Sequence, residues 1–135
     1  MMGTWGPNAF ENDAALDCMA EIVDGGGLAA IDRFLDGVLR TGGDYLEAPD
    51  AECTLAMAEM VASLAGRPAM ETDVPPEIAE WLARAGEAPT PALMAKASLA
   101  THRVVTEPSE LLDLWQETPD FPLWKASVDD LLGRL

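Results

Sequence analysis

Apolar residues recur along most of this chain at the three- and four-residue spacing that places them on one face of an α-helix. The clearest stripe follows Asp120, which can cap a helix, and consists of Phe121, Trp124, Val128, Leu131, Leu132 and Leu135. A similar stripe follows Asn12, another candidate N-cap, and consists of Leu16, Met19, Ala20 and Val23. Alanine and leucine far outnumber valine and isoleucine, which also favours helices over strands.

Glycine, proline and threonine residues separate these helical patterns. The glycine run 25–27 is expected to end the first helix as a flexible turn, and Thr90 is a further candidate N-cap. The predicted helices cover residues 13–24, 28–40, 49–65, 76–85, 91–104, 109–115 and 121–135. We therefore expect an all-α fold, a compact bundle of six to seven helices forming a single domain over residues 1–135. The helix over 49–65 carries small residues on several sides and should be the most centrally packed.

The charge balance narrows the classes of partner. The chain has 24 acidic and 8 basic residues, a formal net charge of −16, and residues 1–80 hold 16 of the acids with only 3 of the bases. Nucleic acids and anionic membrane surfaces need clustered lysine and arginine, so neither is expected as a partner. A negative field over the first part of the chain could instead steer a basic protein toward it, although acid that simply keeps the protein dissolved is the plainer explanation.

Cys18 and Cys53 are the two cysteines of the chain. They are too few for a disulfide scaffold, and we expect two small buried apolar side chains rather than reactive thiols. The N-terminal residues lack the basic and apolar regions of a secretory signal peptide, and no apolar run reaches the length of a membrane span. The sequence thus predicts a cytoplasmic protein.

Side chains with catalytic potential are scarce. His102 is the one histidine; it stands four residues after Ser98 on a predicted helix, a pair that occurs often by chance, and no strand–turn–helix elbow presents the serine. The glycine run 25–27 has no preceding strand and no following lysine, so it does not resemble a phosphate-binding loop. One histidine and two separated cysteines make no zinc site. We expect neither catalytic residues, metal nor cofactor, and hence no enzyme.

The aromatic residues of the N-terminal segment are open to two interpretations. Trp5 lies between Gly3 and Gly6, and Phe10 precedes the candidate cap Asn12. The favoured interpretation is an aromatic clasp, in which both rings cover the core and Phe10 packs on Leu16. The alternative is an exposed aromatic anchor for a binding partner.

The same N-terminal run resembles the opening of an uncharacterised bacterial domain family. Members begin G-x-W-G and continue to F-x-N-D-x-A, which this chain matches with Gly3, Trp5, Gly6, Phe10, Asn12, Asp13 and Ala15. Members often carry a glycine where this chain has residues 7–9, and weaker likeness continues to the helix of Trp124. The family has no established activity, so the resemblance implies no catalytic residue. Small acidic bacterial proteins of this kind are similar in character to immunity proteins, which neutralise toxins by covering them.

These observations favour a non-catalytic protein-binding domain, plausible as an immunity-like inhibitor, that presents an acidic face from residues 8–59 to a basic partner. The candidate partner-binding residues are Trp5, Phe10, Glu11, Asp13, Asp17, Glu21, Asp44, Glu47 and Asp50. The alternative is a helical protein that binds a small molecule or a divalent metal through interior carboxylates, with possible hydrolytic activity. A homo-oligomeric scaffold joined through the Trp124 helix is a third possibility, and the oligomeric state is left open.

Overall fold

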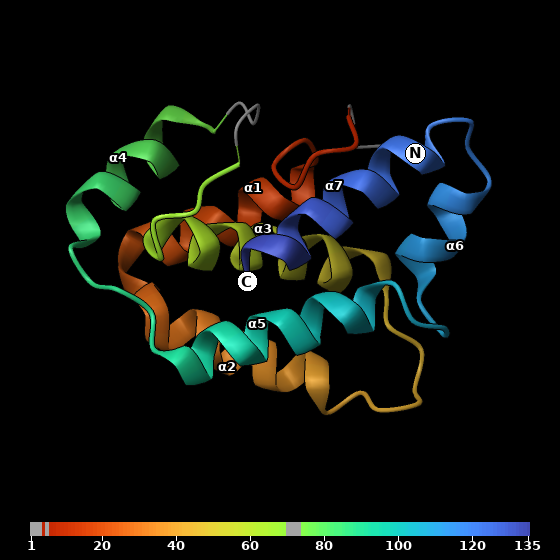
Figure 1. Ribbon diagram of the computed structural model, residues 1–135, viewed down its shortest axis with the longest axis horizontal. Helices are drawn as coiled ribbons and strands as arrows, with labels where there is room; N and C mark the ends of the chain where they lie inside the picture. The colour runs from red at the N-terminus through yellow and green to blue at the C-terminus, as the bar shows by residue number, and fades with distance from the viewer. Residues whose placement is uncertain (1–3, 5, 70–73) are drawn as a thin grey trace.

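The computed structural model describes residues 4, 6–69 and 74–135, and most of them are helical (Figure 1). In chain order the elements are α1 (Asp13–Glu21), the π-helical η1 (Ile22–Gly26), α2 (Gly27–Leu39), α3 (Ala48–Leu64), α4 (Pro76–Ala85), α5 (Pro91–Val104), α6 (Glu110–Gln116) and α7 (Phe121–Arg134). Across the described residues there is no β-strand; the two isolated bridges join Thr4 to Asn12 and Leu46 to Ser109. The predicted compact all-α bundle of six to seven helices is confirmed.

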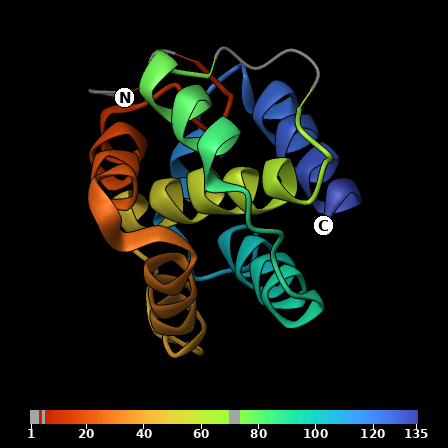
Figure 2. The ribbon, with the colours of Figure 1, turned by 90° about the vertical axis from the view of Figure 1, so that its left-hand side faces the viewer.

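α3 is the axis of the bundle. Figure 2 shows it running through the middle of the molecule, with α1 and α2 on one side and α5 and α7 on the other. Every residue from Cys53 to Ala62 is buried, including alanines at positions 56, 58 and 62 that have no exposed surface. Because these side chains are small, neighbouring helices can approach α3 from several sides. The prediction that helix 49–65 is the most centrally packed is confirmed.

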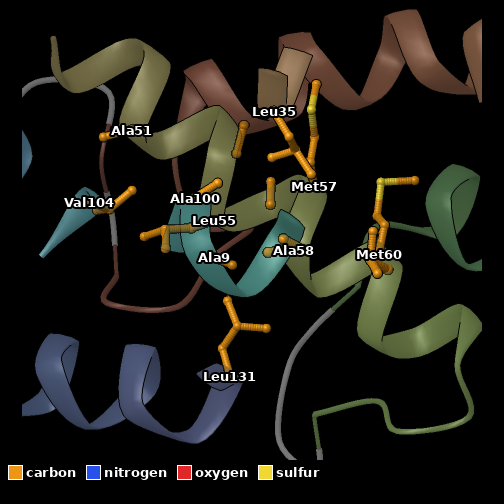
Figure 3. Close-up of a cluster of buried hydrophobic side chains, with 14 of the residues drawn as sticks. Ala9, Leu35, Ala51, Leu55, Met57, Ala58, Met60, Ala100, Val104 and Leu131 are labelled. Atoms are coloured by element: carbon orange, nitrogen blue, oxygen red, sulfur yellow. The ribbon is translucent and has the colours of Figure 1, made fainter. Parts of the chain in front are cut away.

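The apolar stripes of the other helices converge on this axis (Figure 3). Leu35 of α2, Ala100 and Val104 of α5 and Leu131 of α7 are all buried in the same core cluster. Trp124 is 2% exposed and stacks on Trp115 with ring centroids 6.0 Å apart. The Trp124 face of α7 is therefore packed within the molecule.

The glycine run separates α1 from α2, as the sequence predicts. Gly25 has φ 137° and Gly27 has φ 58°, values that L side chains rarely adopt, so the helical backbone is interrupted there and the chain kinks before α2. Glycine adopts these backbone conformations without the steric cost of a Cβ.

Two of the three N-caps predicted from the sequence are present in the structure, and the third differs. The Asn12 side chain accepts a hydrogen bond from the Ala15 N–H at 2.7 Å, and the Thr90 hydroxyl accepts one from the Leu93 N–H at 3.1 Å. Both predicted N-caps are confirmed. Asp120 does not cap α7 with its side chain; its backbone carbonyl instead accepts the first hydrogen bonds of that helix.

The N-terminal segment covers the tryptophan pair. Thr4, Asn8 and Ala9, together with Trp115 and Trp124, enclose a void of only about 10 Å³. Phe10 is 3% exposed and belongs to the core cluster. The clasp is therefore present as far as its described residues show; Trp5, the other ring assigned to it, lies outside the described residues.

An ion pair fixes α7 to the buried axis. Arg134 donates to both carboxylate oxygens of Glu59, at 2.8 and 2.6 Å, and to the exposed carboxylate of Asp130 at 2.9 Å. Glu59 is 3% exposed, so it lies within the bundle although it falls in the range 8–59 expected to form an acidic face. The hydrogen bonds that Arg134 donates to Glu59 raise the pKa of Arg134 above its already high ordinary value, and the guanidinium stays charged.

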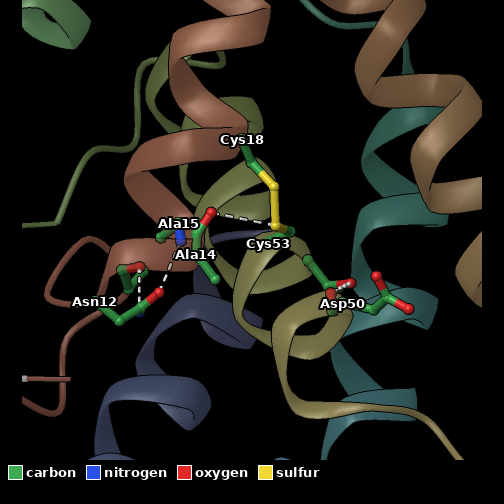
Figure 4. The surroundings of a disulfide bond; sticks show 8 residues. Asn12, Ala14, Ala15, Cys18, Asp50 and Cys53 are labelled. Carbon is green, nitrogen blue, oxygen red and sulfur yellow. Dashed lines mark hydrogen bonds between the residues drawn. A yellow bond between two sulfur atoms is a disulfide. The ribbon is translucent and has the colours of Figure 1, made fainter. Parts of the chain in front are cut away.

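A disulfide joins α1 to α3 and corrects the expectation of two unpaired cysteines. Cys18 and Cys53 are bonded to one another, and the Sγ of Cys53 also lies 3.4 Å from the Ala14 carbonyl oxygen (Figure 4). The two cysteines are separated by 35 positions. No local pattern in the sequence predicts this disulfide, because the two cysteines meet only when α1 packs across α3.

Removing this disulfide should destabilise the protein. Closing a loop of 35 residues restricts the unfolded chain enough for the Cys18→Ala/Cys53→Ala variant to lose about 3 kcal/mol of unfolding free energy. Chemical denaturation measures this loss of unfolding free energy. Reduction of the wild type with dithiothreitol should lower its Tm to about that of the variant. The variant serves as the control, since dithiothreitol should leave its Tm unchanged. An equal Tm for reduced and oxidised wild type would contradict the expectation.

Breaking the buried ion pair should also destabilise the fold. In Glu59→Gln the Arg134 guanidinium loses its partner in a site that is largely closed to water, which should cost about 3 kcal/mol or more in urea unfolding. Asp130→Asn is the matched control, because Asp130 is an exposed partner of the same guanidinium and should change stability by less than about 0.5 kcal/mol. Equal effects of the two substitutions would show that burial does not govern this pair.

Candidate binding surface

The exposed side of α1 carries a row of carboxylates. Asp13, Asp17 and Glu21 are four residues apart and all exposed, so they form one stripe along the helix. Its opposite side holds the buried Ala15 and Met19, which fix the rotation of the helix. The Asn12 cap at its start and the disulfide in its middle hold it against α3 (Figure 4). The packing of α1 therefore forces the acidic stripe outward.

The charge of this stripe is not neutralised locally. Of the five ion pairs between described side chains, none includes a carboxylate of the α1 stripe. The first basic residue in the chain is Arg33, which lies beyond the end of both α1 and η1. Like charges four residues apart on a helix repel one another by a few tenths of a kcal/mol each. A cationic partner would relieve this repulsion.

An apolar hollow of about 260 Å³ lies between α1, η1 and the start of α4. Its apolar lining consists of Leu16, Met19, Ala20, Val23, Pro75 and Ile78. Two carboxylates, those of Asp24 and Glu77, complete the lining and are exposed. In Figures 1 and 2 α4 lies at the periphery of the molecule, and several lining residues of the hollow, among them Ala20, Asp24 and Glu77, are exposed.

The hollow and the acidic stripe are neighbours on α1. Leu16 and Ala20 line the hollow, and Asp17 and Glu21 are the next residue after each of them. Successive residues of an α-helix are about 100° apart, so the carboxylate row lies beside the apolar row. This part of the surface therefore combines an apolar depression with an acidic border.

The structure disperses the remaining candidate residues. Phe10 is buried, and its ring is not presented to a partner; Trp5 lies outside the described residues. Glu11 is engaged locally, since its carboxylate accepts a hydrogen bond from the Asn8 N–H at 3.0 Å. The same carboxylate occupies the space that a Cβ at Gly6 would need, so the two residues pack as a unit.

Asp44, Glu47 and Asp50 belong to a different segment of the chain. They are exposed; Asp44 and Glu47 lie in the loop between α2 and α3, and Asp50 lies in the first turn of α3, the helix that the disulfide joins to α1 (Figure 4). Asp50 lines a shallow hollow with Arg33 and Phe34 of α2. The exposed candidate acids thus come from two segments of the chain, α1 and the loop that leads into α3.

The loop that leads into α3 also carries Tyr45, whose side chain is 52% exposed. Partial burial, followed by the negative charges of Glu110, Asp113, Glu107 and Glu47, raises the pKa of the Tyr45 phenol. A hydrogen bond with Asp113, together with burial, raises the pKa of Glu107. These carboxylates come from distant parts of the chain, and the sequence analysis missed all of them except Glu47.

Backbone contacts bring these distant residues together. Leu46 and Ser109 form a bridge, and Arg103 donates hydrogen bonds to the carbonyl oxygens of Gly42 and Asp44 on one segment and of Thr106 and Pro108 on the other. Arg103 is thus a structural clamp, and no sequence pattern marked it as one. The bridge, together with the Ala48 N–H that donates to the Glu110 carboxylate, places Glu110 near Tyr45, and both contacts arise from tertiary packing.

The residues considered from the sequence for catalysis or metal binding can be placed in the described part of the chain. His102 is exposed on α5, and Ser98 is partly buried one turn before it. Within residues 4, 6–69 and 74–135, no three histidine, cysteine, aspartate or glutamate side chains are grouped so that they could hold a metal ion. Over the same residues, no helix combines the length and apolar character needed to cross a membrane.

Sequence comparison places the chain in a family. The model of a domain of unknown function, DUF4259, matches residues 3–127, which is most of the chain. Neither the curated proteins nor the solved structures contain a match to the chain. The resemblance inferred from the N-terminal run therefore holds at the level of an uncharacterised domain family, and this chain belongs to DUF4259.

Proposed function

We propose that this chain is a non-catalytic protein-binding domain that receives a basic partner on the α1 side of the bundle. The α1 stripe carries the proposal: Asp13, Asp17 and Glu21 are exposed in one row without an ion-pair partner among the described side chains. A row of this kind steers a cationic surface during encounter, and its effect weakens as salt increases.

The finer form of the proposal is an inhibitor similar in character to immunity proteins. Such a protein acts by covering its target and needs no reactive group of its own. The rigid seating of α1, capped by Asn12 and bonded through Cys18, supports this form, because a pre-organised surface loses less entropy on binding.

The redox state of the two cysteines distinguishes between the cell compartments in which the protein could act. The sequence predicts the cytoplasm, where thiols stay reduced, whereas the Cys18–Cys53 disulfide is of the kind that persists in oxidising compartments. Alkylation of free thiols in intact cells, followed by mass measurement, separates the two: two alkylated cysteines support the cytoplasm, and none supports an oxidising compartment.

The metal-binding alternative has no supporting geometry in the described residues, where no suitable group of three ligands occurs. A divalent cation that binds the folded protein would raise the Tm, and above its Kd the stabilisation would grow with the logarithm of the cation concentration.

Charge reversal on α1 should slow association with the partner. A protein retained from a native cell lysate at low salt would be purified and its association rate measured by stopped flow. For Asp17→Lys/Glu21→Lys we expect the rate to fall by about tenfold or more at low salt, with a weaker salt dependence, because steering depends on these charges.

The matched control is Glu117→Lys/Asp120→Lys, which changes the net charge equally at two exposed positions around the start of α7. It should alter the association rate much less than the α1 variant. The proposal fails if the wild-type rate is the same at about 20 mM and about 300 mM salt, since the Debye length falls several-fold between them.

A further inference from the structure

The hollow beside the α1 stripe has the composition of a recognition pocket. Met19 and Ile78 are buried and lie at its base, whereas Ala20 is exposed at its edge. Of the polar and apolar side chains that line it, only Asp24 and Glu77 are charged, and both charges are negative. A group bound in the hollow would therefore contact an apolar interior and two exposed carboxylates.

This charge distribution selects the chemistry of the occupant. An anion would be repelled by Asp24 and Glu77, and by the excess of acid over the whole chain. A purely apolar occupant would fit the interior but would leave both carboxylates without a counter-charge. Arg84, the cation of α4, lies two helical turns from Glu77, about 10 Å along the axis at 1.5 Å per residue. A cation next to an apolar group complements both parts of the hollow.

The size of the hollow points to a side chain of a larger molecule. Its volume of about 260 Å³ is below the range of roughly 300–1,000 Å³ found for small-molecule sites. It can accept one large apolar side chain, in the way that an interface pocket accepts an anchor residue. The neighbouring Asp17 and Glu21 then extend the acidic border toward the rest of the partner.

We propose that the hollow between α1 and α4 receives a large apolar side chain of the basic partner, one that is flanked by lysine or arginine residues paired with Asp24 and Glu77. This inference rests on the proposed function and names the pocket and the partner segment through which it operates. It assigns α4 a direct role, because α4 supplies Ile78 and Glu77 to the pocket.

Capped tripeptides test the pocket without the natural partner. Lys-Phe-Lys should bind the full chain and shift the amide resonances of Ala20, Val23 and Ile78 in two-dimensional NMR titrations. Lys-Ala-Lys should bind about tenfold more weakly or worse, because it lacks the apolar group that leaves water. Glu-Phe-Glu should not bind at these concentrations, since it brings two further negative charges to the carboxylates.

Two variants locate the binding. Ala20→Leu puts a larger side chain at the edge of the hollow from an exposed helical position, and should lower the affinity for Lys-Phe-Lys about tenfold; Ala126→Leu makes the same change on α7 and should not. Asp24→Asn/Glu77→Gln should remove the preference for Lys-Phe-Lys over Glu-Phe-Glu. Glu117→Gln/Asp120→Asn, with the same change in net charge, should retain it.

The outcomes separate this inference from the proposed function. Equal binding of Lys-Phe-Lys and Lys-Ala-Lys, or shifts that avoid α1 and α4, would overturn the pocket. If association of the captured partner still depended on salt and on the α1 carboxylates, the proposed function would stand without it. Selective binding of Lys-Phe-Lys that Ala20→Leu abolishes, combined with a partner insensitive to salt, would support the pocket and overturn the steering mechanism.

Discussion

The burial of α3 on all sides is the constraint on which the rest of the structure depends. A helix with no solvent face needs neighbours on every side, and each buried polar group on it needs a partner. Thr54 meets this need by donating from its hydroxyl to the Asp50 carbonyl oxygen at 2.7 Å. Glu59 meets it through Arg134, which comes from the far end of the chain. The central helix thus determines both the packing order and the position of α7.

The same constraint explains why the elements around α3 are held by a disulfide and by hydrogen bonds as well as by apolar packing. α1 is joined to α3 by the disulfide, and the loop before α3 is held by Arg103 and by the bridge at Leu46. The first N–H of α3, at Ala48, donates to the Glu110 carboxylate at 2.8 Å. α4 has few such ties: Ile78 is its one fully buried residue. The apolar hollow therefore opens where the bundle is least tightly closed.

The sequence predicts what depends on neighbouring residues and misses what depends on distant ones. The helices, their apolar stripes and the Asn12 and Thr90 caps are local features, and all follow from the sequence. The break at the glycine run is local too, since it depends on the positive φ of Gly25 and Gly27. The pairing of Cys18 with Cys53 and the meeting of α1 with the start of α4 require the tertiary fold, so neither could be read from spacing.

The surface around α1 is acidic also because the basic side chains of the chain lie on other elements. Lys96 of α5 lies between Asp32 and Asp36 of α2, at 2.6 and 2.8 Å, and ties those helices together. Arg134 is bound to Glu59, and Arg103 to backbone carbonyls. These cations act on the α2, α5 and α7 sides of the axis, whereas α1 and η1 contain no basic residue. The ion pairs between described side chains thus match carboxylates of α2, α3 and α7, and they leave the carboxylates of the α1 stripe as a negative field on the surface.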